Sequence, residues 1–311
     1  MATTNSLTTT YAGEFAGKYV SAALLSGKTL ANELITVKPN IKFKEVMKKV
    51  STDAIVKDAS CDFDPTSTLT LSERILQPEE FQVNLQLCKK DFVQDWEAIS
   101  MGYSAHSTLP SNFSDFLLAH VADKVAQKME QNIWNGTNAT AGEFDGFVTT
   151  LGADGDVNDV STSETSLTSS NIVAELGKVV DLIPSAVYGK EDLTIYVGSD
   201  AYRAYVRALG GFASNVGAAG TDNKGTQWFN GGALTYDGIN VELASGLPSG
   251  KMVAAEKSNL FFGTGLLSDH NEVKVIDMAD IDGSQNVRVV MRFTAGIQHA
   301  IGGDIVLYQT A

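Results

Sequence analysis

The chain has 311 residues, of which 43% are hydrophobic and 19% are charged. This composition supports one or two hydrophobic cores and excludes an intrinsically disordered chain. No apolar run approaches the roughly 20 residues that a membrane-spanning helix needs, so we expect no membrane insertion. The formal net charge of -14 argues against a nucleic-acid reader, because such proteins neutralise phosphates with clustered Lys and Arg side chains.

The first third of the chain predicts extended structure rather than a core. Residues 1–40 begin with a Thr- and Ser-rich stretch without hydrophobic period, which predicts a polar arm. Residues 41–92 contain TLTLS and FQVNLQL, whose alternation predicts strands with one apolar face. Because a long two-armed hairpin is marginal in water by itself, we expect another surface to cover it.

The clearest helix is predicted over residues 112–135. About 24 residues at 1.5 Å each give a rod of roughly 36 Å, which we interpret as a strut. An apolar side chain recurs every four residues and predicts one buried stripe, formed by Leu117, Val121, Val125, Met129 and Ile133.

Residues 170–270 predict a compact α/β unit. Amphipathic patterns indicate helices over 172–183 and 199–209, with a buried strand at 193–197 between them. A strand pair from Met252 to Phe262 is expected to close this unit. The last fifth of the chain then alternates apolar and polar residues, which predicts plain antiparallel sheet with a tight reversal at residues 280–283.

No pattern of catalytic or metal-binding residues is present in the sequence. The histidines His106, His120, His270 and His299 are scattered and form no HxxxH or HExxH motif. There is no GxSxG, and the glycine-rich segment 210–225 lacks the GK[ST] ending that cradles phosphates. We therefore expect no enzyme, no catalytic residue, no cofactor and no metal site.

The segment between the long helix and the α/β unit predicts a short strand at residues 144–148 and then a surface loop. Its stretch 154–159 faintly resembles a calcium-binding loop, but Asp159 stands where the turn needs Gly and Thr165 where the bidentate Glu belongs. We interpret the stretch as a turn.

Charge is unevenly placed along the chain. Residues 38–57 are rich in Lys, whereas residues 269–282 hold five acids against one Lys. One interpretation is two solvated surfaces. The alternative is that the basic segment of one subunit contacts the acidic segment of another, which would make association salt-sensitive. The candidate contact residues are Lys44, Lys48, Lys49, Lys57, Asp277, Asp280 and Asp282.

The order of these elements resembles the major capsid proteins of tailed bacteriophages with the Hong Kong 97-type fold. The closing stretch VRVVMRFTAGIQHAIGGDIVLY, with Arg292-Phe293-Thr294-Ala295-Gly296 inside it, carries part of this resemblance. The resemblance implies an α+β fold with an N-terminal arm (1–40), an extended hairpin or E-loop (41–92), a peripheral domain (93–165 plus 269–298) with a spine helix (112–135), and an axial α/β domain (166–268 plus 299–311).

The same resemblance implies a structural role. The chain would self-assemble through hexamers and pentamers into an icosahedral head shell that encloses double-stranded DNA without sequence-specific binding. It would meet a portal protein, and also a separate scaffolding protein, because the sequence starts at a Met only about forty residues before its hairpin. Assembly in the cytoplasm of a bacterial host and residence in the virion capsid follow.

Two other function classes remain open at this point. An encapsulin-like nanocompartment shell has a similar fold but packages an enzyme. A monomeric acidic binding protein is the third possibility, and it fits poorly with a long uncovered hairpin, since exposed strand edges invite pairing.

Overall fold

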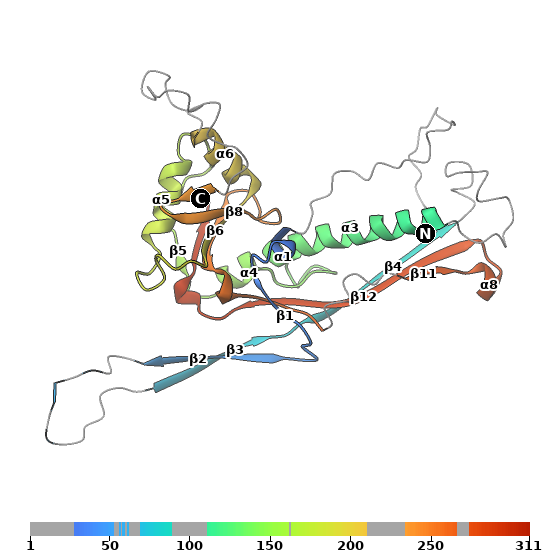
Figure 1. Ribbon diagram of the computed structural model, residues 1–311, viewed down its shortest axis with the longest axis horizontal. Coiled ribbons are helices and arrows are strands. Elements are labelled where there is room, and N and C mark those ends of the chain that lie inside the picture. The colour runs from blue at the N-terminus through green and yellow to red at the C-terminus, as the bar shows by residue number, and fades with distance from the viewer. Residues whose placement is uncertain are drawn as a thin grey trace. The chain divides into compact units, whose positions relative to one another are not determined.

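The computed structural model describes residues 28–52, 69–88, 111–161, 163–209, 234–265 and 274–311, together with Val56, Asp58, Ala59 and Cys61. These residues divide into two units, shown in one ribbon in Figure 1. Unit 1 holds the described residues of Phe81–Ala126 and Ser268–Phe293. Unit 2 holds those of Leu25–Glu80, Gln127–Leu267 and Thr294–Ala311. No helix in the described ranges is both long and apolar enough to cross a membrane.

Unit 2 is built around a mixed sheet with the strand order β5-β13-β9-β6-β8-β7. The central strand β6 runs parallel to β8 and antiparallel to β9. All five residues of β6, LTIYV, are buried, as expected for a strand covered on both faces. The strands are β5 (Asn158–Asp159), β6 (Leu193–Val197), β7 (Leu234–Tyr236), β8 (Ile239–Leu243), β9 (Lys251–Glu256) and β13 (Val306–Gln309).

Two layers of helix cover this sheet. On one face, Leu176 of α5 (Ile172–Asp181) and Tyr205 of α6 (Ser199–Leu209) share a buried cluster with Ile195 of β6, and both helices lie beside the sheet in Figure 1. On the other face, the ring of Tyr196 lies 5.1 Å from that of Trp134. Trp134 ends the long helix α3 (Ser111–Asn135), and its ring lies 5.5 Å from Phe147 of α4 (Phe147–Gly152).

A buried carboxylate attaches the short helix α1 (Lys28–Ala31) to α3. The backbone amide and the hydroxyl of Thr29 donate to Glu130 at 3.1 and 2.6 Å. The Nε1 of Trp134 donates to the same hydroxyl at 2.8 Å. Burial raises the pKa of Glu130, while the hydrogen bonds from Thr29 act in the opposite direction. Thr29 thus satisfies two buried polar groups at once.

A second sheet contributes strands to both units. In unit 2, β10 (Leu260–Gly263) pairs parallel with β1 (Thr36–Lys38) and antiparallel with the last residues of β12 (Asn286–His299). Two 3-10 helices, η2 (Lys257–Asn259) and η4 (Gly302–Asp304), flank β10 and β12 in sequence.

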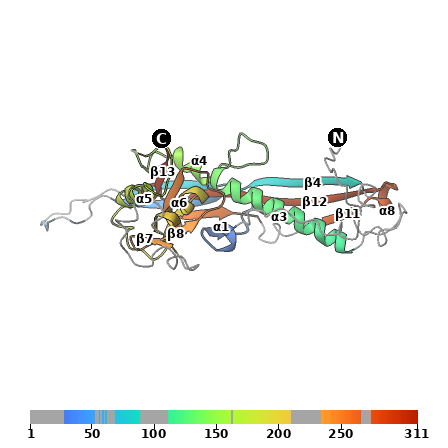
Figure 2. The same ribbon diagram turned by 90° about the horizontal axis from the view of Figure 1, so that it is seen from above.

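In unit 1, the first part of β12 pairs with β11 (Lys274–Asp277) and with β4 (Glu79–Cys88). The three strands lie side by side in Figure 2. The rings of Phe81 and Phe293 are 5.7 Å apart. The predicted alternation along β12 is confirmed, since every second residue is buried in the order Val287, Val289, Met291 and Phe293.

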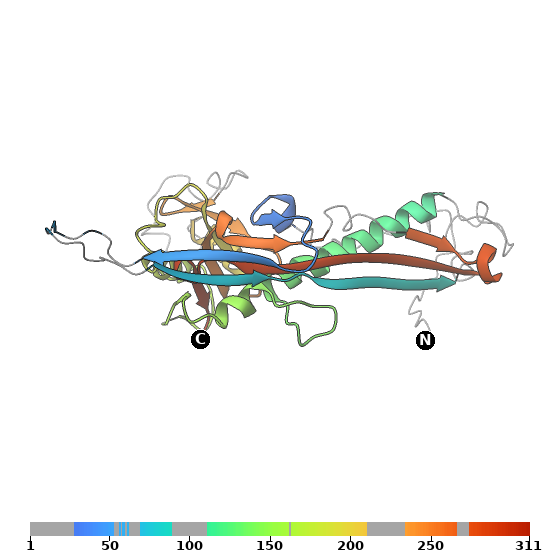
Figure 3. The same ribbon diagram turned by 90° about the horizontal axis from the view of Figure 1, so that it is seen from below.

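The remaining strands form a separate antiparallel hairpin in unit 2. β2 (Glu45–Thr52) pairs along its whole length with β3 (Leu69–Leu76), and Figure 3 shows the two strands side by side in blue and teal. The predicted extended structure is therefore present. β4 continues the chain but pairs with β12 and not with the hairpin.

The helices predicted over 112–135, 172–183 and 199–209 and the strand at 193–197 are confirmed as α3, α5, α6 and β6. Two other expectations are wrong. The strand predicted at 144–148 is absent: residues 144–146 form no regular element and α4 begins at Phe147, because Phe147, Val148 and Leu151 gather on one helical face. The strands between Met252 and Phe262 join different sheets rather than one another. The reversal predicted at 280–283 is present between the antiparallel strands β11 and β12. It contains the four-residue helix α8 (Ala279–Asp282), which Gly283 ends in the left-handed conformation with φ 71°.

Thr29→Val tests the buried junction between α1 and α3. The substitution keeps the side-chain shape but leaves a Glu130 oxygen and the Trp134 Nε1 without their shared hydroxyl. We expect the free energy of unfolding to fall by about 2 to 3 kcal/mol, the cost of buried polar groups that lose a partner. Chemical denaturation measures it, with Thr140→Val at an exposed position as the matched control. Equal effects of the two substitutions would show that the junction does not hold α1.

Candidate assembly surface

One side of the β2–β3 hairpin carries exposed apolar side chains before and after the charged pair Lys48 and Glu73. The strand register places Val46 opposite Ile75 and Val50 opposite Leu71, and residues directly opposite each other project from the same face. Their side chains are between 43% and 65% exposed. We call this strip, together with Leu69 at 59% exposure, the apolar hairpin face.

Burial of the apolar hairpin face against another surface would be favourable. Fully burying a Val, Leu or Ile side chain contributes about 1.5 to 3 kcal/mol. Covering these half-exposed residues would therefore contribute on the order of 5 kcal/mol for each hairpin. Scattered exposed apolar residues are normal, but paired ones on one strand face mark a contact site.

The lysines predicted as contacts lie on different sides of the hairpin. Lys48 is exposed and stands opposite Glu73, in the middle of the apolar hairpin face. Lys49 follows it, stands opposite Ser72, and projects from the other face. Lys44 is exposed just before β2. Lys57 lies outside the described residues.

The acids predicted as contacts lie in unit 1, around α8. Asp277 ends β11 and its carboxylate accepts the amide of Ala279 at 3.0 Å. Asp282 accepts the amide of Ser284 at 2.9 Å, and hydrogen bonds from Ser284 lower the pKa of Asp282. Asp280 lies in α8 between them. The two described carboxylates shape the reversal, and the structure leaves their pairing with a lysine of another copy untested.

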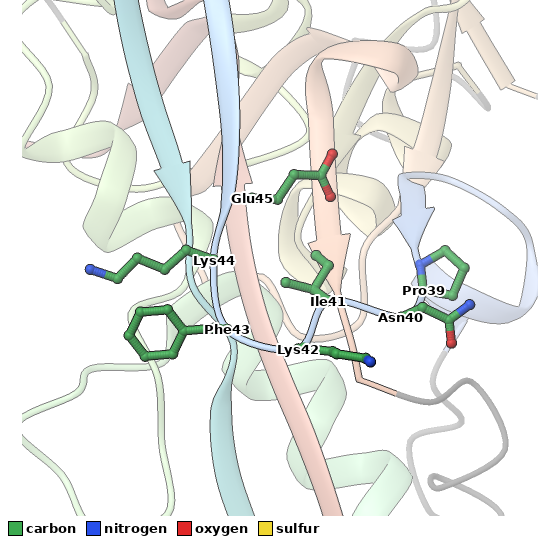
Figure 4. Close-up of a pocket in the computed structure, with 7 residues that line it drawn as sticks. All are labelled: Pro39, Asn40, Ile41, Lys42, Phe43, Lys44 and Glu45. Atoms are coloured by element: carbon green, nitrogen blue, oxygen red, sulfur yellow. The ribbon is translucent and has the colours of Figure 1, made fainter.

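A pocket of about 410 Å³ lies at the bend that leads into β2. Figure 4 shows Phe43 and Lys44 projecting on one side of the chain and Lys42 on the other. The Phe43 side chain is 70% exposed, and the Lys44 ammonium lies 5.3 Å from the centre of its ring. An exposed ring beside a lysine ammonium is suited to an acidic partner surface. The pocket is lined by Pro39, Asn40, Ile41, Lys42, Phe43, Lys44 and Glu45.

The base of the hairpin is attached to the body of unit 2. Leu76, the last residue of β3, is fully buried. The side-chain amide of Gln298 donates to the carbonyl of Ile75 at 3.1 Å. On the side where the chain enters the hairpin, Lys38 at the end of β1 forms an ion pair with Glu45 at the start of β2. Between them, the amide of Ile41 donates to the carbonyl of Thr264 at 3.1 Å.

One carboxylate oxygen joins the hairpin to β12. The Oδ2 of Asp154 lies 2.5 Å from Nη2 of Arg74 on β3 and 2.8 Å from Nε2 of His299, the last residue of β12. Asp156 lies 3.9 Å from the same guanidinium nitrogen. Burial acts to raise the pKa of Asp154, but hydrogen bonds from His299, the Asp156 amide and Arg74 outweigh it and hold that pKa below its usual range. We call Arg74, Asp154, Asp156 and His299 the base cluster.

His299 in the base cluster is completely buried, and its pKa lies below the usual value for a histidine. Burial lowers its pKa, and the positive charge of Arg74 acts in the same direction, while the hydrogen bond to Asp154 opposes them. Its Nδ1 has no hydrogen-bond partner among the described residues. The neutral ring therefore donates through Nε2 to Asp154.

Sequence reasoning missed the base cluster. The loop at 154–159 reads as an ordinary acidic turn, and His299 reads as one of four scattered histidines. The partners are 80 and 145 residues away from Asp154 in sequence, so no spacing rule could bring them together. One signal was available, since a His in a strand that is apolar at every second residue is expected to be buried and to need a partner. Within the described residues, no three His, Cys, Asp or Glu side chains are grouped so that they could hold a metal ion.

Comparison with solved structures identifies the fold. The chain is similar to the capsid of a native GTA particle, with a TM-score of 0.63 and 15% identity over 95% of this chain and 94% of that one. The chain has a capsid fold. A chain of Gordonia phage Cozz gives a TM-score of 0.59 at 13% identity, over 94% of this chain and 89% of that one. A satellite phage P4 procapsid gives 0.51 at 10% identity, over 91% and 98%.

The capsid fold is thus confirmed by likeness in structure, at identities too low to carry more than the fold. No family model matches the sequence, and no curated protein matches it. The predicted α+β class is confirmed with it.

His299→Gln tests the electrostatics of the base cluster. The unfolded chain protonates a histidine with a pKa of about 6.5, whereas folded His299 stays neutral at lower pH. The unfolded state therefore binds more protons, and the free energy of unfolding should fall as the pH drops below about 6.5. Glutamine keeps a donor for Asp154 but does not titrate, so this slope should be smaller in the variant.

Chemical denaturation between pH 5 and 7.5 measures the slope, with His120→Gln as the control. The other charged groups facing His299 are Arg74, Asp154 and Asp156, and hydrogen bonds hold the pKa of Asp154 below its usual range. An unchanged slope in His299→Gln would contradict a buried neutral histidine.

Proposed function

We propose that this chain is the major capsid protein of a tailed phage and assembles into the icosahedral head shell around double-stranded DNA. The observation that carries the proposal is the apolar hairpin face, which a single subunit leaves in water. A capsid fold supplies the context, because shells bury such a surface by repeating one contact between copies.

The proposal assigns a part of the shell subunit to each element. The β2–β3 hairpin is the extended loop that reaches a neighbouring copy, and α3 is the spine helix. The six-stranded sheet with α5 and α6 forms the axial domain, and β4, β11 and β12 belong to the peripheral domain. The domain limits expected from the sequence are 1–40, 41–92, 93–165 plus 269–298, and 166–268 plus 299–311, and the assignment of β4 departs from them. The pairing of β4 with β12 favours assigning β4 to the peripheral domain and not to the hairpin.

The proposed partners follow from the same role. Copies of the chain would form hexamers and pentamers, which a capsid solved with C5 symmetry among the similar structures supports. A portal protein and a separate scaffolding protein are expected, and one similar procapsid includes a size determination protein. The net charge of -14 suits a wall that encloses DNA without binding it tightly. Assembly would take place in the bacterial host cytoplasm.

The compartment alternative differs in cargo and not in fold. The similar structures named above are capsids and phages rather than enzyme-filled compartments, so it is not favoured. Negative-stain electron microscopy of the chain expressed alone and with its neighbouring genes tests the proposal. Closed shells with DNA-packaging partners would support it. Shells filled with an enzyme would favour the compartment, and a monodisperse monomer under every condition would overturn both.

Leu71→Ser and Ile75→Ser test the apolar hairpin face. Both side chains are exposed in the subunit, so we expect the free energy of unfolding to change by no more than about 0.5 kcal/mol. Loss of buried area at every copy should abolish or strongly reduce shells in sedimentation velocity. Val173→Ser, at an exposed apolar residue of α5 with 46% exposure, is the matched control. Normal shells from the hairpin variants would contradict the assignment of this face.

Charge reversal tests the proposed pairing of Lys44, Lys48, Lys49 and Lys57 with Asp277, Asp280 and Asp282 of another copy. Lys48→Glu would face Glu73 in its own hairpin, so Lys44→Glu and Lys49→Glu are the cleaner variants. We expect slower assembly at low salt and a smaller difference from wild type at high salt, where exposed charges are screened. Light scattering measures the rate, with Lys124→Glu as the charge-matched control. Equal rates at low salt would exclude the pairing.

A further inference from the structure

The base cluster lies where the attached part of the hairpin ends. Toward the body, Leu76 is fully buried, two residues beyond Arg74. Away from the body, all residues from Leu69 to Glu73 are exposed. Arg74 therefore stands at the boundary between the held and the free part of β3.

The two faces of the hairpin differ in their contacts at this boundary. Arg74 and Leu76 alternate with Ile75 along the strand, so they project from the face opposite the apolar hairpin face. Arg74 binds Asp154 on this inner side while Ile75 remains exposed on the outer side. A contact that fixes the inner side sets the direction in which the outer side points.

Hydrogen bonds hold the backbone and the carboxylate of Asp154 in place. Its amide donates to the carbonyl of Leu151 at 3.1 Å, and its carbonyl accepts the amide of Val157 at 3.2 Å, which holds the turn after α4. Its Oδ1 accepts the amide of Asp156 at 3.2 Å. Oδ2 is thereby left for Arg74 and His299.

The approach to Asp154 depends on a glycine. A Cβ at Gly302 would lie 2.5 Å from Oδ2 of Asp154, closer than a Cβ atom approaches an atom to which it is not bonded. Any larger residue at 302 would push the carboxylate away from Arg74 or His299. Packing at this position thus leaves room for the ion pair.

The ion pair between Arg74 and Asp154 is partly buried. The Arg74 side chain is 27% exposed and that of Asp154 is 15% exposed. A fully exposed ion pair contributes little to the free energy of unfolding. Removing one partner of a partly buried pair is more costly, because the remaining charge no longer has an opposite charge beside it. His299 adds a directional hydrogen bond that orients the carboxylate.

We propose that Asp154 is a latch residue that sets the direction of the β2–β3 hairpin by binding Arg74 and His299 through one oxygen. Opening the latch leaves β2 and β3 paired but lets the hairpin swing about its base. The latch is a property of the subunit. Its consequence for the shell rests on the proposed function, because a hairpin that swings would present the apolar hairpin face to its neighbour at varying angles.

Electron–electron distance measurements on spin-labelled chains test the latch. One label is placed at Ser72→Cys on β3 and one at Ala174→Cys on α5, both exposed positions in unit 2, after Cys61 and Cys88 are replaced by Ser. Labelled chain is diluted with an excess of unlabelled chain, so that only distances within one subunit are recorded whether or not shells form.

We expect one narrow distance peak in the parent chain and a second population in Arg74→Met and Asp154→Asn. The displaced population should rise roughly tenfold, which corresponds to about 1.4 kcal/mol. Gly302→Ala should produce the same second population although it removes no polar partner. Arg74→Lys should restore most of the narrow peak. Lys49→Met, which removes a charge from the same hairpin face, should leave the distribution unchanged.

A distribution that stays narrow in Arg74→Met, Asp154→Asn and Gly302→Ala would overturn the latch. The same result in Lys49→Met as in Arg74→Met would also overturn it, since a general loss of charge would then explain the change. Far-UV circular dichroism identifies any variant that fails to fold, and Arg74→Met, at a partly exposed site, keeps the test open in that case. Electron microscopy of the same samples reports separately on shells, so a chain that forms none would count against the proposed function and not against the latch.

Discussion

The uncovered apolar face of one hairpin is the constraint on which the rest of the structure depends. A two-stranded sheet is marginal in water, and here its inner face is held at the base while its outer face keeps Val50 and Leu71 more than half exposed. Such an arrangement is costly for a subunit that stays alone. Under the proposed function a second copy would cover the strip, and folding and assembly of the subunit would then be linked.

Carboxylates that are largely buried join segments that lie far apart in the sequence. Glu130 binds Thr29, 101 residues away, and Asp154 binds His299, 145 residues away. Desolvating a carboxylate costs free energy that only well-placed donors recover. These hydrogen-bonded carboxylates therefore favour one arrangement of α1 and of the hairpin base around the sheet of unit 2. Apolar packing alone is not directional and would leave that arrangement less well defined.

Local sequence patterns predicted most of the helices and strands. They did not predict which strands pair when the partners are far apart in the sequence. The four-residue repeat through Val121 and Ile133 identified α3, and the alternation from Val287 to Phe293 identified β12. Phe147 was misassigned because two adjacent apolar residues suit a strand or a helix equally. The partners of β9 and β10 could not be predicted, since buried strands carry no information about which neighbour they join. The lysines of the candidate surface were found by charge, but their division between two hairpin faces follows from the register, and the junction of Asp154 with Arg74 and His299 follows only from the fold.

Footprinting of the wild-type chain with a reactive carbene, before and after assembly, tests the central claim most directly. The label modifies exposed side chains, and mass spectrometry reports the modified fraction of each peptide. We expect strong labelling of residues 69–75 and 46–50 in the unassembled subunit and marked protection in the assembled particle, with residues of α5 as an internal reference. Equal labelling of the hairpin in both states would contradict the claim that another copy covers its apolar face.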